Sequence, residues 1–404
     1  MMKLFAGALV FALVLLSGPV VVAAEDVKLD ARATILMEAE TGRVLQAENE
    51  HEKLPPASVT KVMTMLLIYE ALDQERIKWD DVVTISAHAA SMGGSQVFLE
   101  AEQKQTVRDL TKSIVIASAN DAAVAMAEFI AGSEEAFVSQ MNKKAAELGM
   151  ENTHFLNACG LDADGHLTTA YDIALMSREL ILKYPDVIDY ATTRLDTITH
   201  RTARGEEEFG LTNTNKLLRR YSGITGLKTG STGLAKYCIS ATAEKEGMQL
   251  IAVVLAAPDP TVRFDSAAQL LDYGYANYAL MAKEESGTQM GEIHVYKGKT
   301  ESVSVVIKEQ TNVLAPKGKH ITVDGEVQII ESLTAPVAAG TSAGVVIYTH
   351  DGTEVGRSEL VVADDVAKVN VADMMARLFA RWLYTEAAPV EAVPTDDAPE
   401  KGAE

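Results

Sequence analysis

The sequence predicts a mixed α/β domain, then a small all-β sandwich, then a C-terminal amphipathic helix. Three observations predict this order. Strand-like segments stand at both ends of a helical stretch, which indicates a sheet closed by remote parts of the chain. From about residue 285 the pattern changes to short runs rich in β-branched residues and punctuated by Gly, Lys and Pro, as in a β-sandwich. The last apolar segment has helical periodicity.

The first domain is expected over residues 25–283. The stretch "ATILMEAETGRVLQAEN" (33–49) indicates two strands around a Thr41-Gly42 turn. From residue 58 to residue 72 apolar residues recur with helical spacing and gather on one face, which predicts an amphipathic helix. Further helices are predicted near 107–116, 120–131, 134–148, 170–184 and 261–280, and a strand pair near 234–243 and 248–256.

The C-terminal part is expected to hold a β domain over 284–364, a helix over 365–385 and a tail over 386–404. The tail is rich in Pro and acidic residues, which predicts disorder. The helix has an apolar side flanked by arginines and is suited to lie flat in a membrane interface. The alternative is an amphipathic helix packed on its own β domain. Its apolar side holds Val371, Met374, Met375, Leu378, Phe379, Trp382 and Leu383, and its polar side Asn370, Asp373, Arg377 and Arg381.

Composition excludes some classes of partner. With 404 residues, of which 48% are hydrophobic, the chain can bury a large core and is predicted to hold more than one domain. Its formal net charge is −21, and it has no basic cluster of the kind that a polyanion requires. No nucleic-acid partner is therefore expected.

The N-terminus indicates export. Lys3 is followed by a long apolar run and then by small residues at Val22 and Ala24, which match a signal-peptidase site. This predicts a signal peptide over residues 1–24 and a mature start near Glu25. The alternative is a retained membrane anchor, because the run approaches the length that spans a bilayer. Export is the preferred interpretation and places the protein on the outer side of the cytoplasmic membrane.

Cysteine and histidine give no sign of a metal centre. Cys159 and Cys238 are the two cysteines, and they are far apart in the sequence. We treat both as free, although an exported protein would allow them to pair. The eight histidines are scattered without metal-ligand spacing. No metal and no cofactor are predicted.

The stretch "PPASVTK" (55–61) places a hydroxyl and an amine one helical turn apart. Two prolines precede a predicted helix start, so Ser58 is positioned to cap the first turn, with Lys61 within reach of its hydroxyl. A serine becomes nucleophilic when a base takes its proton, and a lysine is such a base only while it is neutral. Alone, Ser-x-x-Lys is a weak signal, and a capped surface helix is the ordinary interpretation.

Two further segments carry chemistry-bearing residues at predicted element boundaries. In "IASANDAA" (116–123), Ser118 and Asn120 stand where an apolar segment breaks before a helix, and a plain N-cap is the alternative. In "GITGLKTGSTGLAKYCIS" (223–240), Lys228 enters a predicted strand between glycines that permit close approach of the backbone to a ligand. There the alternative is a β-turn with a solvated lysine.

Together the three segments are a strong signal. Ser-x-x-Lys, Ser-x-Asn and Lys-Thr-Gly in this order are typical of penicillin-binding proteins and class A β-lactamases. The chain resembles the low-molecular-mass penicillin-binding proteins, the serine-type D-alanyl-D-alanine carboxypeptidases, from its signal peptide to its last helix. The resemblance includes "CGLDADGH" and "LTTAYDIALMS", which look like that family's segment along the site. It implies a serine β-lactamase/DD-peptidase-like fold.

The resemblance also implies roles for the motif residues. Ser58 would form the acyl-enzyme, with Lys61 as its general base. Ser118 would pass a proton towards the leaving D-alanine, and Asn120 would bond the substrate's amide backbone. Lys228 would help to keep Lys61 neutral.

The remaining roles concern the substrate's carboxylate and the oxyanion. Lys228 and Thr229 would hold the terminal carboxylate. Arg263 stands where the family places an arginine near that group, although a surface arginine paired with Asp259 or Asp265 is the alternative. The oxyanion hole would consist of the backbone N–H groups of Ser58 and Ser231.

The expected function is removal of the terminal D-alanine from peptidoglycan stem pentapeptides, with acylation by β-lactam antibiotics. The C-terminal helix is expected to contact the membrane surface. One alternative is a class A-like β-lactamase, which uses a glutamate to activate the deacylating water. The stretch "GLDADGHLTTAYD" contains no glutamate. The other alternative is a non-catalytic module that binds peptidoglycan or penicillin.

Overall fold

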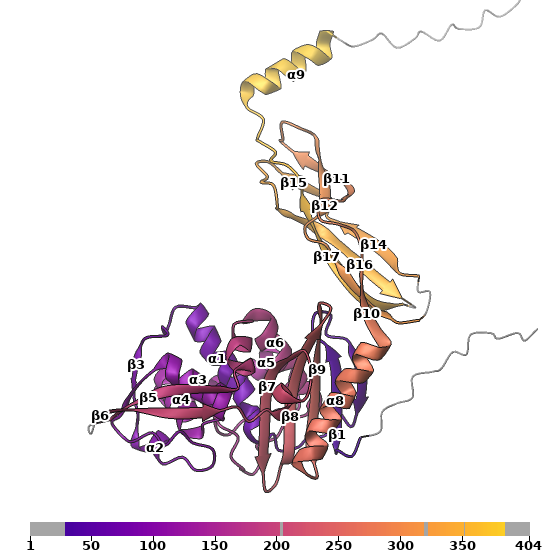
Figure 1. Cartoon of the computed structure of the whole chain (residues 1–404). Helices are drawn as coiled ribbons and strands as arrows, with labels where there is room; N and C mark the ends of the chain where they lie inside the picture. Colours follow the sequence, from indigo (N-terminus) through magenta and orange to yellow (C-terminus); the bar gives the residue numbers. More distant parts are fainter. Residues whose placement is uncertain (1–28, 203–204, 319–321, 351, 384–404) are drawn as a thin grey trace, which may run out of the picture. The chain divides into compact units, whose positions relative to one another are not determined.

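The computed structural model describes residues 29–383, except 203–204, 319–321 and 351 (Figure 1). The predicted signal peptide and the acidic tail lie outside the described residues. The chain divides into two compact units. The first is Met1–Leu280 with Leu314–His320, and the second is Met281–Val313 with Ile321–Glu404.

A five-stranded antiparallel sheet forms the centre of the first unit, with the order β2-β1-β9-β8-β7. The N-terminal strand β1 pairs with β9, more than 200 residues later, with Ile35 opposite Val253. The prediction of a sheet closed by remote segments is confirmed. The strands are β1 (Ala33–Glu38), β2 (Val44–Glu48), β7 (Ile224–Thr232), β8 (Lys236–Lys245) and β9 (Met248–Ala257).

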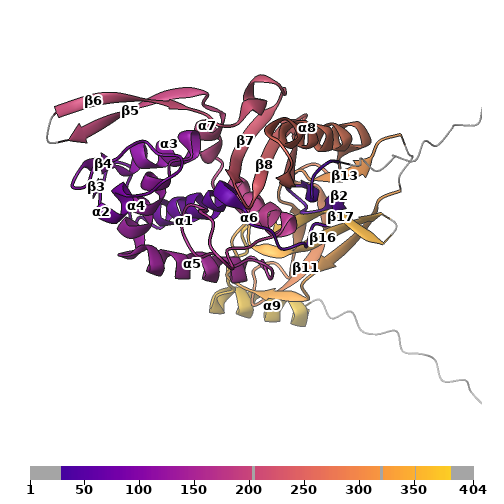
Figure 2. The same ribbon diagram turned by 90° about the horizontal axis from the view of Figure 1, so that it is seen from below.

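Helices cover both faces of this sheet (Figure 2). Because side chains alternate along a strand, Ile35 packs in the core with α1 and α6, whereas Leu36 packs with α8. The predicted helices are present within a few residues of their expected ends. They are α1 (Lys61–Asp73), preceded by the short η1 (Ala57–Thr60), and α3 (Val107–Ala117), α4 (Asn120–Ala131), α5 (Glu134–Glu147), α6 (Ala170–Lys183) and α8 (Pro260–Asn277).

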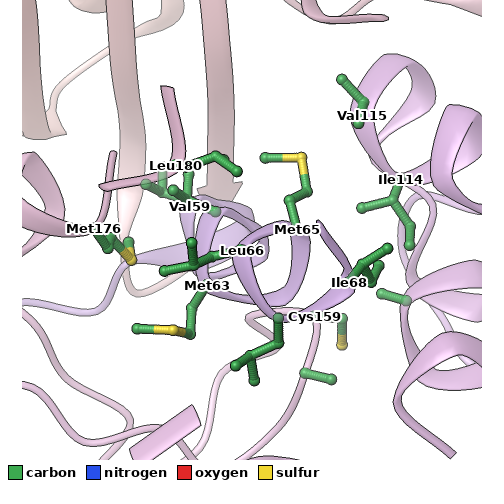
Figure 3. Close-up of a cluster of buried hydrophobic side chains, with 14 of the residues drawn as sticks. Val59, Met63, Met65, Leu66, Ile68, Ile114, Val115, Cys159, Met176 and Leu180 are labelled. Atoms are coloured by element: carbon green, nitrogen blue, oxygen red, sulfur yellow. The ribbon is translucent and has the colours of Figure 1, made fainter. Parts of the chain in front are cut away.

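Helix α1 is buried on all sides, not on one face as its sequence predicted (Figure 3). Residues 61–69 are all buried, including Lys61 and Thr64. A helix in this position is the centre of a core, so polar side chains on it need partners inside the protein. Figure 3 labels four side chains of α1 itself, Met63, Met65, Leu66 and Ile68, and side chains of other segments, Val59, Ile114, Val115, Cys159, Met176 and Leu180.

A second sheet in the first unit was not predicted. Its order is β3-β4-β5-β6, and its strands are short or rich in exposed polar residues, so they lack the alternation that marks a strand. The elements without a prediction are β3 (Val82–Thr84), α2 (Ala87–Ala90), β4 (Lys104–Thr106), α7 (Val187–Thr192), β5 (Leu195–Thr202), β6 (Gly205–Thr212) and η2 (Lys216–Arg219).

The second unit is an all-β domain followed by a helix. Its strands form one six-stranded sheet, β14-β16-β17-β12-β11-β15, around a core that includes Ile293, Val305 and Leu360. The prediction of a small β domain is confirmed. The strands of this sheet are β11 (Gln289–Tyr296), β12 (Ser302–Ile307), β14 (Asp324–Ile329), β15 (Ser332–Thr334), β16 (Ser342–His350) and β17 (Thr353–Val362). A separate two-stranded pair, β10 (Tyr278–Ala282) with β13 (Asn312–Pro316), contains residues of both units.

Helix α9 (Val371–Leu383) lies in the segment predicted to be amphipathic. The apolar side chains that the structure describes on this helix are exposed, with Val371 at 76%, Leu378 at 60% and Phe379 at 58%. These residues are therefore not packed on the β domain, which is the alternative that the sequence left open. None of the described helices has both the length and the hydrophobicity needed to cross a membrane.

Candidate active site

Ser58 lies in η1, immediately before α1. The prolines place the chain in a tight turn, and Ala57 adopts a positive φ of 49°. Ser58 is half-buried, whereas Val59 and Thr60, which follow it in η1, are fully buried. Ser58 lies inside η1, whose N-cap position is Pro56, so the interpretation that Ser58 caps the first turn is wrong. The hydroxyl instead accepts a hydrogen bond from Lys61 Nζ at 3.1 Å.

The Lys61 amine is buried with neutral partners. Besides Ser58, it donates to Asn120 Oδ1 at 2.5 Å and to the Cys159 carbonyl at 2.7 Å. Burial lowers the pKa of Lys61 from 10.5 to about 8, against smaller opposing influences of the Cys159 side chain and of Asp121. A substantial fraction of this amine is therefore neutral in mildly alkaline solution, as a general base for Ser58 requires.

The Ser-x-Asn segment connects α3 to α4. Ser118 ends α3 in a left-handed conformation with φ 63°, and its hydroxyl accepts a bond from Lys228 Nζ at 2.8 Å. Asn120 begins α4 without capping it, so the N-cap alternative is wrong here as well. Its side-chain amide nitrogen donates to the Gly93 carbonyl at 2.6 Å, which fixes the oxygen towards Lys61.

Lys228 is buried in β7 and is not a solvated lysine of a turn. It is 1% exposed and donates to Ser118 Oγ and to the Thr229 carbonyl at 2.9 Å. Burial, and then the charges of Lys61 and Arg263, lower the pKa of Lys228 well below its usual range. The two buried amines of Lys61 and Lys228 repel each other when both are charged. An anion bound at Lys228 would therefore favour a protonated Lys228 beside a neutral Lys61.

The Thr229 hydroxyl shares a hydrogen bond of 2.7 Å with the hydroxyl of Thr214. Thr214 was not predicted as a site residue, because "TNTN" has no spacing relative to the Lys-Thr-Gly segment that marks it. A neighbour, Asn215, donates to the Gly226 carbonyl at 2.9 Å and so fastens this segment to β7. The pair of threonine hydroxyls extends the polar surface beside Lys228.

Two glycines allow the three segments to meet. A Cβ added at Gly230 would lie 2.8 Å from the Ser58 nitrogen, and one at Gly160 would lie 1.9 Å from the Ala57 carbonyl oxygen. Any side chain at either position would force β7 or the 157–165 loop away from Ser58. The residue after Gly230 is Ser231, exposed on the edge strand of the five-stranded sheet.

Arg263 lies behind β7 rather than on the surface. It is 7% exposed and donates to the Gly230 carbonyl at 3.1 Å and the Cys238 carbonyl at 3.4 Å. Asp265 pairs with another arginine, and Asp259 caps α8, so the predicted alternative of a surface ion pair is wrong. Burial lowers the pKa of Arg263 to about 10, and its charge acts on Lys228.

A shell of residues that the sequence did not indicate supports the site. The hydroxyl of Thr60, between Ser58 and Lys61, bonds to His166 Nε2 at 2.9 Å. The other ring nitrogen accepts the Leu156 N–H at 3.0 Å, so Nε2 is the donor. Burial lowers the pKa of His166 to about 4, which keeps the ring neutral. His166 thus joins the turn at Ser58 to Leu156, and Leu156 and His166 are the residues on either side of the 157–165 loop.

The arrangement is suited to acyl transfer to a serine. It brings two hydroxyls and two buried amines into one site, from η1 and the start of α1, from the turn between α3 and α4, and from β7. In the described part of the chain, no group of His, Cys, Asp or Glu is placed to hold a metal ion. Cys159 and Cys238 are both buried and free, as we expected.

Comparison with known proteins identifies two matching families. Residues 20–259 match the D-alanyl-D-alanine carboxypeptidase family, peptidase S11, and residues 283–368 match the C-terminal domain of penicillin-binding protein 5. The chain is 42% identical to the D-alanyl-D-alanine carboxypeptidase DacF of Bacillus subtilis, over 87% of this chain and 90% of that protein. It is 33% identical to DacC of Escherichia coli, over 92% and 95%.

Solved structures show the same architecture. Penicillin-binding protein 5 of Haemophilus influenzae matches with a TM-score of 0.71 and 31% identity, covering 86% of this chain and all of that one. PBP3 of Streptococcus pneumoniae matches with a TM-score of 0.74 and 29% identity, over 84% of this chain and 100% of its own.

Proposed function

The chain belongs to the peptidase S11 family of D-alanyl-D-alanine carboxypeptidases, and we propose that it removes the terminal D-alanine from peptidoglycan stem pentapeptides through an acyl-enzyme at Ser58. Penicillins would acylate the same serine. The catalytic part would be residues 25–283, with 284–364 as a separate β domain. The contact that best supports this proposal is Lys61 Nζ with Ser58 Oγ, in a buried site without a carboxylate bonded to the amine.

The reaction would proceed in two steps. Neutral Lys61 takes the proton of Ser58 as its oxygen attacks the carbonyl carbon of the D-Ala–D-Ala bond. The backbone N–H groups of Ser58 and Ser231 would stabilise the oxyanion, a contribution that typically reaches about 3 kcal/mol per donor. Ser118 would deliver a proton to the departing amine, so that D-alanine leaves, and water would then hydrolyse the ester.

The substrate's own carboxylate would be held at Lys228 and Thr229, while Asn120 would bond the amide backbone of the peptide. Arg263 would act through its charge and through the Gly230 carbonyl that it holds. A carboxylate beside Lys228 favours the protonated form of that amine and thereby the neutral form of Lys61. Substrate binding and base activation would thus be coupled.

A D-alanine release assay on a muramyl pentapeptide, run beside labelling with a fluorescent penicillin, tests the proposed function. A carboxypeptidase releases D-alanine catalytically and keeps the penicilloyl label. Rapid loss of the label would favour a β-lactamase, and labelling without D-alanine release would favour a binding module.

The rate of acylation should rise with pH as Lys61 loses its proton. With a pKa of about 8, about one molecule in ten has the neutral amine at pH 7. Below pH 8, the rate of penicillin labelling should increase about tenfold for each unit by which the pH rises. Above pH 8 the rate should level off. Stopped-flow labelling of the free enzyme measures this profile. A rate independent of pH between 6 and 8 would contradict the role of Lys61.

We further propose that the protein is exported by its first 24 residues and acts in peptidoglycan biosynthesis at the outer face of the cytoplasmic membrane. Helix α9 would attach it there peripherally. The support is the exposed apolar side of α9, which includes Met374 and Met375 in addition to the residues given above. An amphipathic helix with such a side gains free energy by lying in the headgroup region.

Deleting α9 should release the protein from membranes. The truncated chain should end at Asn370, because Val366 is part of the β domain. Val366 is buried, and its backbone N–H and C=O both form hydrogen bonds with the backbone of Val337. A chain ending at Leu383 is the matched control and should still sediment with vesicles of anionic and zwitterionic phospholipid. If the chain without α9 sediments equally well, the helix is not the attachment.

A further inference from the structure

A carboxylate lies beside the last residue of β7, four positions beyond Lys228 along the strand. Asp162 is exposed in the 157–165 loop, and its Oδ1 accepts a hydrogen bond from Thr232 Oγ1 at 2.6 Å. A longer contact of 3.5 Å joins Oδ2 to the Leu234 N–H. In the described part of the chain, Asp162 thus takes hydrogen bonds from β7 and the turn after it, but forms no ion pair.

Asp162 and Thr232 are placed beside Ser58 by the two glycine contacts. Gly160 packs on the Ala57 carbonyl, and Gly230 packs on the Ser58 nitrogen. Two residues beyond each glycine, the loop and the strand meet again at the bond between Asp162 and Thr232. The hydrogen bond between these two side chains therefore holds the 157–165 loop and β7 together beside Ser58.

The order of residues along β7 gives the site a direction. Lys228 and Thr229, which would hold the terminal carboxylate, come before Gly230, and Ser231 would bind the oxyanion after it. The scissile carbonyl lies between the leaving D-alanine and the rest of the stem peptide. The residue that precedes the D-Ala–D-Ala pair must then extend in the other direction, towards Thr232, Leu234 and Asp162.

We propose that Asp162 is a specificity-determining residue that favours stem peptides with a free side-chain amine on the residue before D-Ala–D-Ala. This inference rests on the proposed function. The ammonium group of such a substrate residue would form an ion pair with the exposed Asp162 carboxylate, which the hydrogen bond from Thr232 already orients. The exposed side chain of Leu234, at 68%, supplies an apolar surface for the methylene stem of such a residue.

The test compares two tripeptides, Nα-acetyl-L-Lys-D-Ala-D-Ala with a free side-chain amine and its Nα,Nε-diacetyl form. The unmodified enzyme should release D-alanine with a kcat/KM about fivefold higher for the free amine, the upper range for an exposed ion pair. Asp162→Asn keeps an oxygen that can accept the Thr232 hydroxyl but removes the charge. It should abolish the preference and leave turnover of the diacetyl peptide unchanged.

Two further variants separate charge from architecture. Asp164→Asn changes a nearby exposed acid of the same loop and should retain the preference. Thr232→Val removes the hydrogen bond, keeps the Asp162 charge, and should retain most of the preference. An unmodified enzyme that treats both peptides equally, or a preference that survives in Asp162→Asn, would overturn the inference. Release of D-alanine from the diacetyl peptide reports separately whether the proposed function holds.

Discussion

Replacing Ser58 with alanine should abolish both penicillin labelling and D-alanine release. The substitution removes the atom that would form the acyl bond, so no slower route to the same covalent product remains. The loss should therefore reach the detection limit of both assays. Labelling by fluorescent penicillin on a denaturing gel and D-alanine release from a pentapeptide measure it.

The same substitution should leave the fold intact. The Ser58 hydroxyl accepts one bond from Lys61 and caps no helix, so its removal should change the free energy of unfolding by about 1 kcal/mol or less. Ser113→Ala is a matched control, because that buried hydroxyl of α3 bonds to the Asp109 carbonyl of its own helix. It should label normally. Undiminished labelling of Ser58→Ala would refute the nucleophile assignment.

Replacing Lys228 with methionine should lower kcat/KM for peptides with a free terminal carboxylate by about a hundredfold. Methionine fills the buried space but carries no charge, so the carboxylate loses a charge-assisted hydrogen bond. Lys61 also loses the neighbouring charge that would favour its neutral form. The measurement is D-alanine release from a pentapeptide as the free acid and as its terminal amide.

The comparison of the two peptides identifies the role of Lys228. The unmodified enzyme should prefer the free acid strongly, and Lys228→Met should lose most of that preference. Lys308→Met, at an exposed lysine paired with Glu359 in the second unit, should behave as the unmodified enzyme. If the unmodified enzyme cleaved acid and amide equally, Lys228 would not be holding a carboxylate.

Much of the fold followed from local pattern. The helices α3 to α6 and the strands β8 and β9 have clear periodicity, and their boundaries were predicted within a few residues. The sheet of β3 to β6 was missed, because strands such as β6, with three consecutive glutamates, take their pairing from neighbours rather than from their own alternation. Helix α1 was assigned one apolar face, because the sequence does not show how many sides of a helix the fold covers.

The site divides in the same way. The Ser-x-x-Lys, Ser-x-Asn and Lys-Thr-Gly motifs are short-range patterns, and each was visible in the sequence. The shared hydrogen bond of Thr214 with Thr229, the His166 bridge to Thr60 and the Cys159 carbonyl that receives Lys61 join residues far apart in the chain. No spacing rule connects such residues.

The sequence by itself determined which side chains are available for acyl transfer and in which order they occur. Tertiary structure alone decided that Lys61 is buried among neutral acceptors, that Lys228 lies against Ser118, and that Arg263 faces backbone carbonyls rather than solvent. The physical reason is that the pKa of an amine depends on its loss of water and on nearby charges, and both are set by packing between remote segments.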